Sequence, residues 1–444
     1  MPDGLAPIAL LTLLSSLLAS SLVQLFRLAL NRSKSEAATF RMTVSGLLGA
    51  AASVIALSFI LATSGPQRID AGHWFHQGNY DFAMLFVVDS VAVTYGFISV
   101  GLLLLIAAFS RRYLHKEAGF HRFYLFLTLF GLGLITVSFA GTLEILTIGW
   151  EIVGLLSVLL IAFFTTRPKP AKNALRAFVT YRLGDVGLIT AALILHHLHA
   201  AGFTILEGRS WFGIGEGSAS IGYLLLLAAA AKSALFPVSG WLPRAMEGPT
   251  PSSAVFYGAL SVHLGPLLLI RAGGIIEANP GVAAAIVAIG LVTAVLGRMV
   301  GQVQTDVKSR LAYGSITQLG IIVAEVGLGL HVLALVHIGA HAAVRTLQIL
   351  RAPSLLHEHQ HLEQMLGHPL RSEPSAETPG PFARWRYAFS LERGGLDTLL
   401  RDRVVFGVLG LVGRLDRLDA RAADRLMGSQ TSRPSHPPVS GTVQ

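Results

Sequence analysis

Ionisable side chains interrupt the apolar stretches of this chain at a few positions, and these residues are the ones best able to do chemistry. They are Glu144, Glu151, Arg182, Asp185, Lys232, His263, Arg298, His337, His341 and Arg345. A charged group at bilayer depth costs about 2.5–3.5 kcal/mol on insertion scales, so each one needs a partner and a role. Because Glu, Lys and His can all change protonation when they are removed from water, the set predicts a proton relay.

Each of these residues taken alone also has a structural interpretation, as a polar core group that holds helices together. Arg182 and Asp185 are three residues apart, close enough to pair, and a self-neutralising pair favours a structural role for them. Arg298 lies near the end of its apolar stretch, where its side chain can extend to the interface. The prediction of a relay therefore depends on Glu151, Lys232 and the histidines considered together.

The composition places this chemistry in lipid. The 444 residues are 52% hydrophobic and 13% charged, and the mean hydropathy is +0.61. Soluble domains carry about 25% charged residues. Apolar runs of roughly 20 residues, each long enough to span a hydrocarbon core, recur along most of the chain. The sequence therefore predicts an all-α polytopic membrane protein.

We expect about eleven transmembrane helices, at 5–30, 41–63, 82–109, 121–140, 142–165, 173–199, 219–242, 250–272, 280–303, 309–329 and 331–352. Four prolines at 237, 243, 249 and 251 interrupt the seventh and eighth segments. Irregular backbone inside a membrane is tolerated where protein or a water-filled cavity satisfies its polar groups. We therefore expect the seventh helix to be discontinuous.

The loops indicate an orientation. Lys and Arg are concentrated in the connections after the first, third and fifth segments, and the alternate connections are poorer in them. The positive-inside rule then puts the N-terminus outside and the C-terminal tail in the cytoplasm, as expected for a protein of the cell inner (plasma) membrane. The first apolar run lacks a basic leader and a cleavage pattern, so we expect it to be a retained helix.

The chain divides into five predicted regions. Residues 1–81 hold the first transmembrane helices and a loop, and residues 82–352 form the main membrane domain. Residues 353–384 read as a cytoplasmic linker. Residues 385–428 alternate apolar and charged residues, which is typical of an amphipathic interfacial or docking segment. Residues 429–444 are rich in Ser, Pro and Gly, and we expect them to be disordered.

Several other chemistries are not supported. The net charge of +9 is spread over short loops, without the concentrated basic face that nucleic-acid binding needs. The absence of cysteine excludes disulfides and thiolate metal sites. His357, His359 and His361 are better explained by a solvated polar helix than by a metal site. No phosphate-binding loop or dinucleotide fingerprint is present, so we predict no cofactor, no metal and no redox or hydrolytic site. At most, the chain would be a subunit of a translocase.

The chain contains five distinctive motifs: GWEIVGLLSVLLIAF at 149–163, RLGDVG at 182–187, AKSALFPVSGWLPRAMEGPTPSSA at 231–254, QTDVKSRLAYGSITQLG at 304–320 and HIGAHAAVRTLQIL at 337–350. These motifs resemble the antiporter-like, proton-conducting subunits of respiratory complex I (chain 5, or L type) and of Mrp antiporters. The resemblance covers about residues 82–352. It implies an antiporter-like fold of inverted repeats, each built around a broken helix.

The resemblance also implies residue roles. Glu151 and Lys232 would form the ion pair that modulates proton affinity, with Lys232 as the central carrier. His337 and His341 would lie on the connecting path, to which we add Glu144 and His263. Supporting polar roles fall to Arg182, Asp185, Arg345, Asp306 and Lys308.

The chain departs from the family pattern in three places. Tyr257 stands where the family has a histidine, with His263 nearby, and Arg345 stands where it has a lysine, which is far easier to deprotonate than arginine. The spans end after the eleventh, so we expect a truncated second repeat. The truncation and the residues at 351–367 also resemble the DabB-type subunits of inorganic-carbon uptake systems, which pair with a zinc carbonic-anhydrase-like subunit.

The sequence therefore predicts a proton-translocating membrane subunit that couples proton motive force to an associated complex, with the bilayer and other membrane or cytoplasmic subunits as partners. It leaves two alternatives: a membrane subunit of NADH-quinone oxidoreductase proper, or a non-conducting scaffold for a cytoplasmic enzyme.

Overall fold

The computed structural model describes residues 4–30, 35–77, 80–197, 218–255, 260–367 and 380–395, with a few positions between 410 and 418. Its long helices are α1 (Leu5–Ala29), α2 (Glu36–Ser64), α3 (Ser90–Tyr113), α4 (Phe120–Phe139), α5 (Leu143–Ile161), α6 (Pro168–His197), α7 (Ser218–Lys232), α12 (Pro280–Gln302), α13 (Val307–Gly327) and α14 (His331–Leu366). Its shorter elements are β1 (Gln67–Gln77), β2 (Tyr80–Val88), α8 (Trp241–Arg244), η1 (Ala245–Glu247), α9 (Thr250–Ser253), η3 (Ser261–His263), α10 (Leu264–Arg271), α11 (Gly273–Ala278), α15 (Pro381–Leu391) and η4 (Arg393–Gly395).

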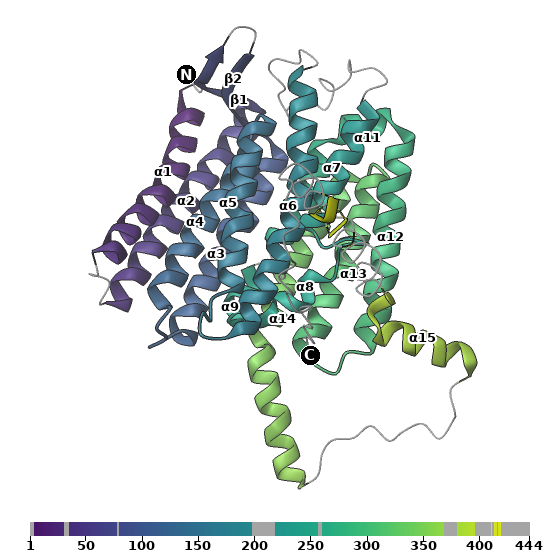
Figure 1. Cartoon of the computed structure of the whole chain (residues 1–444). Helices are drawn as coiled ribbons and strands as arrows, with labels where there is room; N and C mark the ends of the chain where they lie inside the picture. Colours follow the sequence, from purple (N-terminus) through teal and green to yellow (C-terminus); the bar gives the residue numbers. More distant parts are fainter. Residues whose placement is uncertain are drawn as a thin grey trace, which may run out of the picture. The chain divides into compact units, whose positions relative to one another are not determined.

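The long helices run alongside one another, as Figure 1 shows for α1 to α6. In the described part of the chain, eight helices are long and apolar enough to cross a membrane: α1 to α6, α12 and α14. The remaining three predicted spans correspond to α7, to the short helices around α10, and to α13. The multi-pass helical architecture predicted from the sequence is therefore confirmed.

Side-chain caps fix where several helices begin. Ser35, Asp89, Thr142 and Asp306 each accept a hydrogen bond from a backbone N–H in the first turn of the helix that follows. These bonds satisfy donors that would otherwise have no partner at a helix N-terminus. They set the registers of α2, α3, α5 and α13, and with them the positions of the polar residues that these helices carry.

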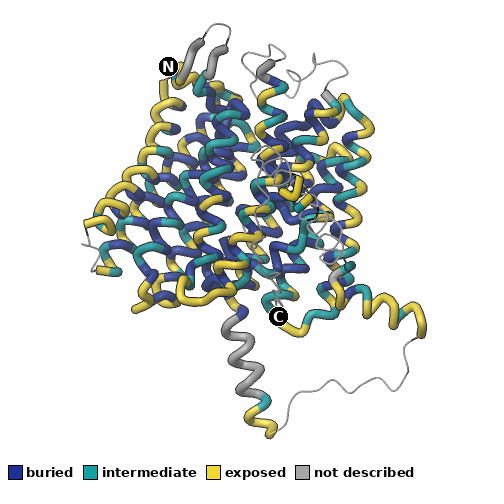
Figure 2. Tube along the Cα trace, viewed as in Figure 1, coloured by how far each residue is buried: buried dark blue, intermediate teal, exposed yellow. Residues whose placement is uncertain are grey.

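Large apolar side chains cover the outer faces of the helices. Phe59 on α2 is 70% exposed and Val336 on α14 is 63% exposed. Figure 2 shows exposed residues along the outer sides of α1 and α12, while the faces turned inward are buried. Apolar exposure of this kind is unfavourable in water and is expected where the solvent is lipid.

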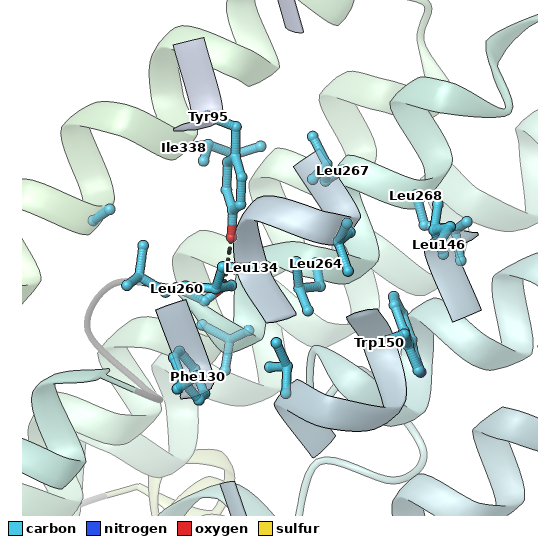
Figure 3. Close-up of a cluster of buried hydrophobic side chains, with 14 of the residues drawn as sticks. Tyr95, Phe130, Leu134, Leu146, Trp150, Leu260, Leu264, Leu267, Leu268 and Ile338 are labelled. Atoms are coloured by element: carbon cyan, nitrogen blue, oxygen red, sulfur yellow. Dashed lines mark hydrogen bonds between the residues drawn. The ribbon is translucent and has the colours of Figure 1, made fainter. Parts of the chain in front are cut away.

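The interior is a packed apolar core that contains few polar groups. Figure 3 shows part of it, with Tyr95 of α3, Trp150 of α5 and Leu264 of α10 among leucines of neighbouring helices. The Tyr95 hydroxyl donates a hydrogen bond of 2.7 Å to the Leu260 carbonyl oxygen. That bond fixes the irregular chain before α10 against α3.

A β-hairpin occupies one end of the helical bundle, at the top of Figure 1, and the sequence analysis missed it. Its strands β1 and β2 pair antiparallel. The third predicted helix was expected to begin at residue 82, which is wrong, because residues up to Val88 belong to β2 and α3 begins at Ser90. The apolar run of β2 leads directly into the apolar run of α3, and the Asp89 cap separates the two.

The two interrupted segments are built from short helices. The seventh is discontinuous as predicted: α7 ends at Lys232, and the chain resumes helical structure at Trp241. The Trp241 indole N–H donates to the Ala231 carbonyl oxygen at 3.0 Å, and the Phe236 N–H donates to Thr293 Oγ1 at 2.9 Å. Protein groups therefore satisfy the exposed backbone of the break, as a membrane interior requires.

The end of the described chain differs from the expected boundaries. The helix expected over residues 331–352 continues as α14 to Leu366, into the stretch expected to be a linker. Helix α15 contacts the end of α12, and its Ser390 is buried. Residues 368–379, most of the predicted 385–428 segment and the 429–444 tail lie outside the described residues.

Candidate proton-transfer site

Among the lysines, arginines and acidic residues that the structure describes, Lys232 is the most deeply buried, with 1% of its surface exposed. It is the last residue of α7, where the helix breaks. Its Nζ donates a hydrogen bond of 3.0 Å to the Trp150 carbonyl oxygen. The ring centroids of Trp150 and Tyr181 both lie 4.6 Å from Nζ, within the range of cation–π attraction. The ammonium group is therefore held by a carbonyl dipole and two aromatic faces.

Gly154 leaves room for the Lys232 ammonium group beside α5. A Cβ atom at Gly154 would lie 2.8 Å from Lys232 Nζ, closer than real Cβ contacts come. Gly154 is one helical turn after Trp150 on α5, so both residues face α7. The glycine leaves the space that the ammonium group fills.

A network of charges adjoins this ammonium. Arg182 of α6 bonds to the Glu151 carboxylate, and it also lies 2.8 Å from Asp185 Oδ2. Asp185, which is 3% exposed, accepts a hydrogen bond of 2.8 Å from the Trp150 indole N–H. Two carboxylates, one guanidinium and one ammonium thus balance one another, and we call Glu151, Arg182, Asp185 and Lys232 the lysine cluster.

The pairing inside the lysine cluster is more extensive than the sequence suggested. The predicted Arg182–Asp185 pair is present, and Glu151 shares the same arginine. The resemblance implied a Glu151–Lys232 ion pair. In this structure Glu151 bonds to Arg182 instead, while Lys232 interacts through space with Asp185 and Glu151.

Two buried histidines form the next polar contact. His263 Nε2 and His341 Nδ1 lie 2.8 Å apart, and their exposed fractions are 0% and 6%. His263 lies in the 3₁₀ turn η3 at the start of α10, where its backbone caps that helix. The other ring nitrogen of His341, Nε2, is buried and has no hydrogen-bond partner among the described residues. One histidine must donate to the other, so this contact is able to pass a proton.

His337, one helical turn before His341, is held by residues that the sequence analysis missed. Its Nδ1 lies 3.0 and 3.1 Å from the two carboxylate oxygens of Glu325, and its Nε2 lies 3.0 Å from Gln318 Oε1. Both partners belong to α13. A signal was present, because Glu325 interrupts an apolar run near the end of that helix. We call His263, His341, His337, Glu325 and Gln318 the histidine cluster.

Serine hydroxyls lie between the two clusters. Ser157 Oγ of α5 is 3.3 Å from Ser261 Oγ, and both residues are fully buried. Ser157 is three residues beyond Gly154, and Ser261 is two residues before His263. The two hydroxyls therefore form a polar contact between α5, which carries Gly154 beside Lys232, and the turn that precedes α10.

The other predicted residues make further contacts. Glu144 lines a largely apolar cavity of about 590 Å³ together with Trp74 and Ile189. Arg345 donates a hydrogen bond of 2.9 Å to Gln348 Oε1. Asp306 caps α13, and Lys308 is half-buried in the first turn of that helix. Tyr257 and the side chains of His357, His359 and His361 lie outside the described residues.

A second buried ion pair was also missed. Arg271 of α10 pairs with Asp89, the cap of α3, and donates to the Ser138 carbonyl oxygen at 3.0 Å. Arg271 is 7% exposed. The pair joins three segments that are far apart in the sequence, which is a structural role, and it could not be assigned before α3 and α10 were known to be neighbours.

Comparison with known protein families identifies the class of protein to which this chain belongs. Residues 140–368 match the model of the NADH:quinone oxidoreductase/Mrp antiporter transmembrane family, and residues 74–124 match that of the complex I chain 5 N-terminus. The chain therefore belongs to the NADH:quinone oxidoreductase/Mrp antiporter family of multi-pass membrane proteins.

Particular relatives include NAD(P)H-quinone oxidoreductase chain 5 of Synechocystis sp., which is 35% identical over 66% of this chain and 44% of its own length. The probable inorganic carbon transporter subunit DabB1 of Halothiobacillus neapolitanus is 32% identical over 79% of this chain and 61% of its own. A solved Mrp complex from Dietzia sp. matches with a TM-score of 0.65 and 26% identity, over 85% of this chain and 39% of the matched chain. The chain spans less than half the length of the quinone oxidoreductase relatives that it matches.

Proposed function

We propose that this chain is a proton-translocating subunit that couples proton motive force to an associated complex. The observation that supports the proposal is a series of side chains inside an apolar bundle that can take up and release protons. It begins at Glu151 and Lys232, passes the buried serines, and ends at the three histidines. Groups of these types exchange protons, and their placement at bilayer depth is costly without a function.

In this proposal Lys232 is the central carrier, because it is the cation held at the break of α7. The arginine-bridged carboxylates set its electrostatic surroundings. A proton leaving Lys232 moves toward His263 and His341 by way of water and hydroxyl groups, and His337 exchanges it at the far end. Glu144 stays a proposed member of the path, while Arg345, Asp306 and Lys308 are supporting residues rather than carriers.

The proposed orientation follows from the loops. The ends of α1, α3 and α5 lie at the lower side of Figure 1, where the connections richest in Lys and Arg follow them. By the positive-inside rule that side is cytoplasmic, so the hairpin end and the N-terminus are outside and the C-terminal tail is cytoplasmic. The plasma membrane is the proposed location.

The proposed partner is a complex that performs inorganic-carbon uptake, with a zinc carbonic-anhydrase-like protein as its cytoplasmic member. Support comes from DabB1, which shares more of its own length with this chain than the quinone oxidoreductase relatives do. Purification of the tagged chain from native membranes, followed by mass spectrometry, identifies the partner. Recovery with quinone-oxidoreductase subunits would assign the chain to that complex instead.

Lys232→Ala tests conduction directly. We expect it to abolish proton flux into vesicles that contain the purified complex, while the amount of assembled complex stays the same. Lys172→Ala is the matched control, since Lys172 is an exposed lysine at the start of α6, and it should leave the flux unchanged. Normal flux in the Lys232 variant would leave the non-conducting scaffold as the function.

A further inference from the structure

We propose that His337, Glu325 and Gln318 form a proton-loading site at the end of the histidine cluster, in which His337 is held as an imidazolium between two acceptors. The proposal rests on the proposed proton conduction and deepens it, because it assigns Glu325 and Gln318 of α13 to the path.

The first argument is the hydrogen-bond chemistry of the ring. Nδ1 faces both oxygens of the Glu325 carboxylate, at 3.0 and 3.1 Å, and Nε2 faces the amide oxygen of Gln318, at 3.0 Å. A carboxylate and an amide oxygen both accept hydrogen bonds. A ring that donates to acceptors on both sides carries protons on both nitrogens, and it is therefore a cation. We assign the arrangement with the Gln318 amide oxygen toward the ring to the loaded site.

The second argument is the charge of Glu325. Its side chain is 15% exposed and lies near the end of an apolar helix. A carboxylate at such depth is costly unless a positive charge compensates it. Among the described residues, its partner is His337. An imidazolium at His337 neutralises the carboxylate, whereas a neutral imidazole would leave the negative charge without compensation.

The third argument is that Gln318 supplies a second stable state. Loss of the Nε2 proton leaves a lone pair on that nitrogen, and a half-turn of the Gln318 amide brings its NH₂ group to donate to the lone pair. The Nδ1 proton stays on the bond to Glu325 throughout. The ring therefore has a satisfied hydrogen-bond arrangement both with and without the transferred proton, and the two states differ by one amide rotation.

The position of the site provides both a source and an acceptor for the proton. His337 lies six residues from the start of α14, about 9 Å along the helix. Its side chain is 23% exposed. His341, one turn deeper, has a buried Nε2 without a described partner. While the Gln318 amide turns, Nε2 is open to water, and a proton from His341 reaches it through one water molecule. It leaves the same nitrogen to a water molecule at the exposed edge of α13 and α14.

Four helices surround the helix that carries His337. Helix α14 contacts α13, α3, α9 and α10. Glu325 is the charged residue that α13 turns toward His337, and α14 carries His341 and Arg345 further along the same side. On α10 and α3, Arg271 and Asp89 are paired with each other. The charge of His337 is therefore governed mainly by Glu325.

Glu325→Gln in the reconstituted full complex is the decisive variant. It keeps the shape of the side chain and removes its charge. We expect proton flux to fall roughly tenfold or more, as for the loss of a group that exchanges protons. Glu277→Gln is the matched control, because Glu277 is an exposed glutamate on α11, and it should leave the flux unchanged. Glu325→Asp, which restores the charge, should recover part of the flux.

The protonation state supplies a readout that a purely structural role would not change. In ¹⁵N solid-state NMR at neutral pH, we expect a signal from a histidine with both ring nitrogens protonated that is lost in His337→Gln, which assigns it to His337. Glu325→Gln should remove that signal, and Glu325→Asp should retain it. Gln318→Met, which eliminates the amide rotation, should retain the signal and lower the flux.

Two results would overturn the proposal: a neutral His337 in the unaltered chain, or full flux in Glu325→Gln. Failure of the underlying function looks different. If Lys232→Ala retained full flux, conduction through this chain would be wrong, yet the NMR signal would still report the state of His337.

Discussion

The lysine cluster and the histidine cluster both hold polar groups inside an apolar bundle, but they stabilise those groups in different ways. The lysine cluster contains full charges of both signs, and Arg182 alone bridges Glu151 and Asp185. The histidine cluster is built mostly from groups that can be neutral, in contacts of 2.8–3.1 Å. The first is neutralised by fixed partners, while the second is satisfied in more than one protonation state. We infer that the carboxylates and arginine of the first cluster set the electrostatic field around the carrier Lys232, and that the second cluster passes the proton on.

Arg182→Gln and His341→Gln test this division with the largest expected effects. Loss of Arg182 leaves two carboxylates without their bridging cation, and one uncompensated charge costs about 3 kcal/mol in the membrane. We expect the amount of folded protein in the membrane to fall severalfold, measured by quantitative blotting. His341→Gln removes a group that can be neutral, so the amount should stay within about twofold while proton flux falls roughly tenfold or more. The reverse pattern would refute the division.

Two glycines on α5 sharpen the comparison between packing and transfer. A Cβ at Gly149 would lie 2.7 Å from the Gly133 carbonyl oxygen and 2.8 Å from the Val137 nitrogen, which are backbone atoms of α4. Gly149→Ala should therefore destabilise the protein by about 1–3 kcal/mol. At Gly154 the nearest atom is the mobile end of Lys232. Gly154→Ala should preserve thermal stability, displace the ammonium group and lower the flux severalfold. Equal loss of stability in both variants would contradict this explanation.

Trp150→Phe and Tyr181→Phe probe the smallest expected effects, within the lysine cluster itself. Trp150→Phe retains an aromatic face over Lys232 but removes the N–H that donates to Asp185. A hydrogen bond to a charged group contributes about 1.5–3 kcal/mol, so we expect a severalfold loss of flux. Tyr181→Phe retains the ring that faces the ammonium, and its flux should change by less than about twofold. A larger loss in the tyrosine variant would assign the hydroxyl a role in transfer.

Much of the fold could be predicted from the sequence, because helix spans depend on local composition. The apolar runs located the membrane helices, and Pro237 indicated the break after Lys232. The hairpin was missed because the apolar residues of β2 run into those of α3 without a change in composition, and only pairing with β1 distinguishes them.

For the candidate site, too, local composition predicted one part and helix packing decided the other. The sequence by itself determined that Glu151, Lys232 and the histidines are ionisable groups in apolar surroundings, because a charge stands out wherever its neighbours are apolar. It could not determine which groups meet, since that depends on how α5, α6, α13 and α14 pack. Only the tertiary structure showed that Glu151 pairs with Arg182 and that His263 contacts His341. It also showed that Glu325 and Gln318 lie on either side of His337. Partners are decided by contacts between helices distant in sequence, and local composition carries no record of those contacts.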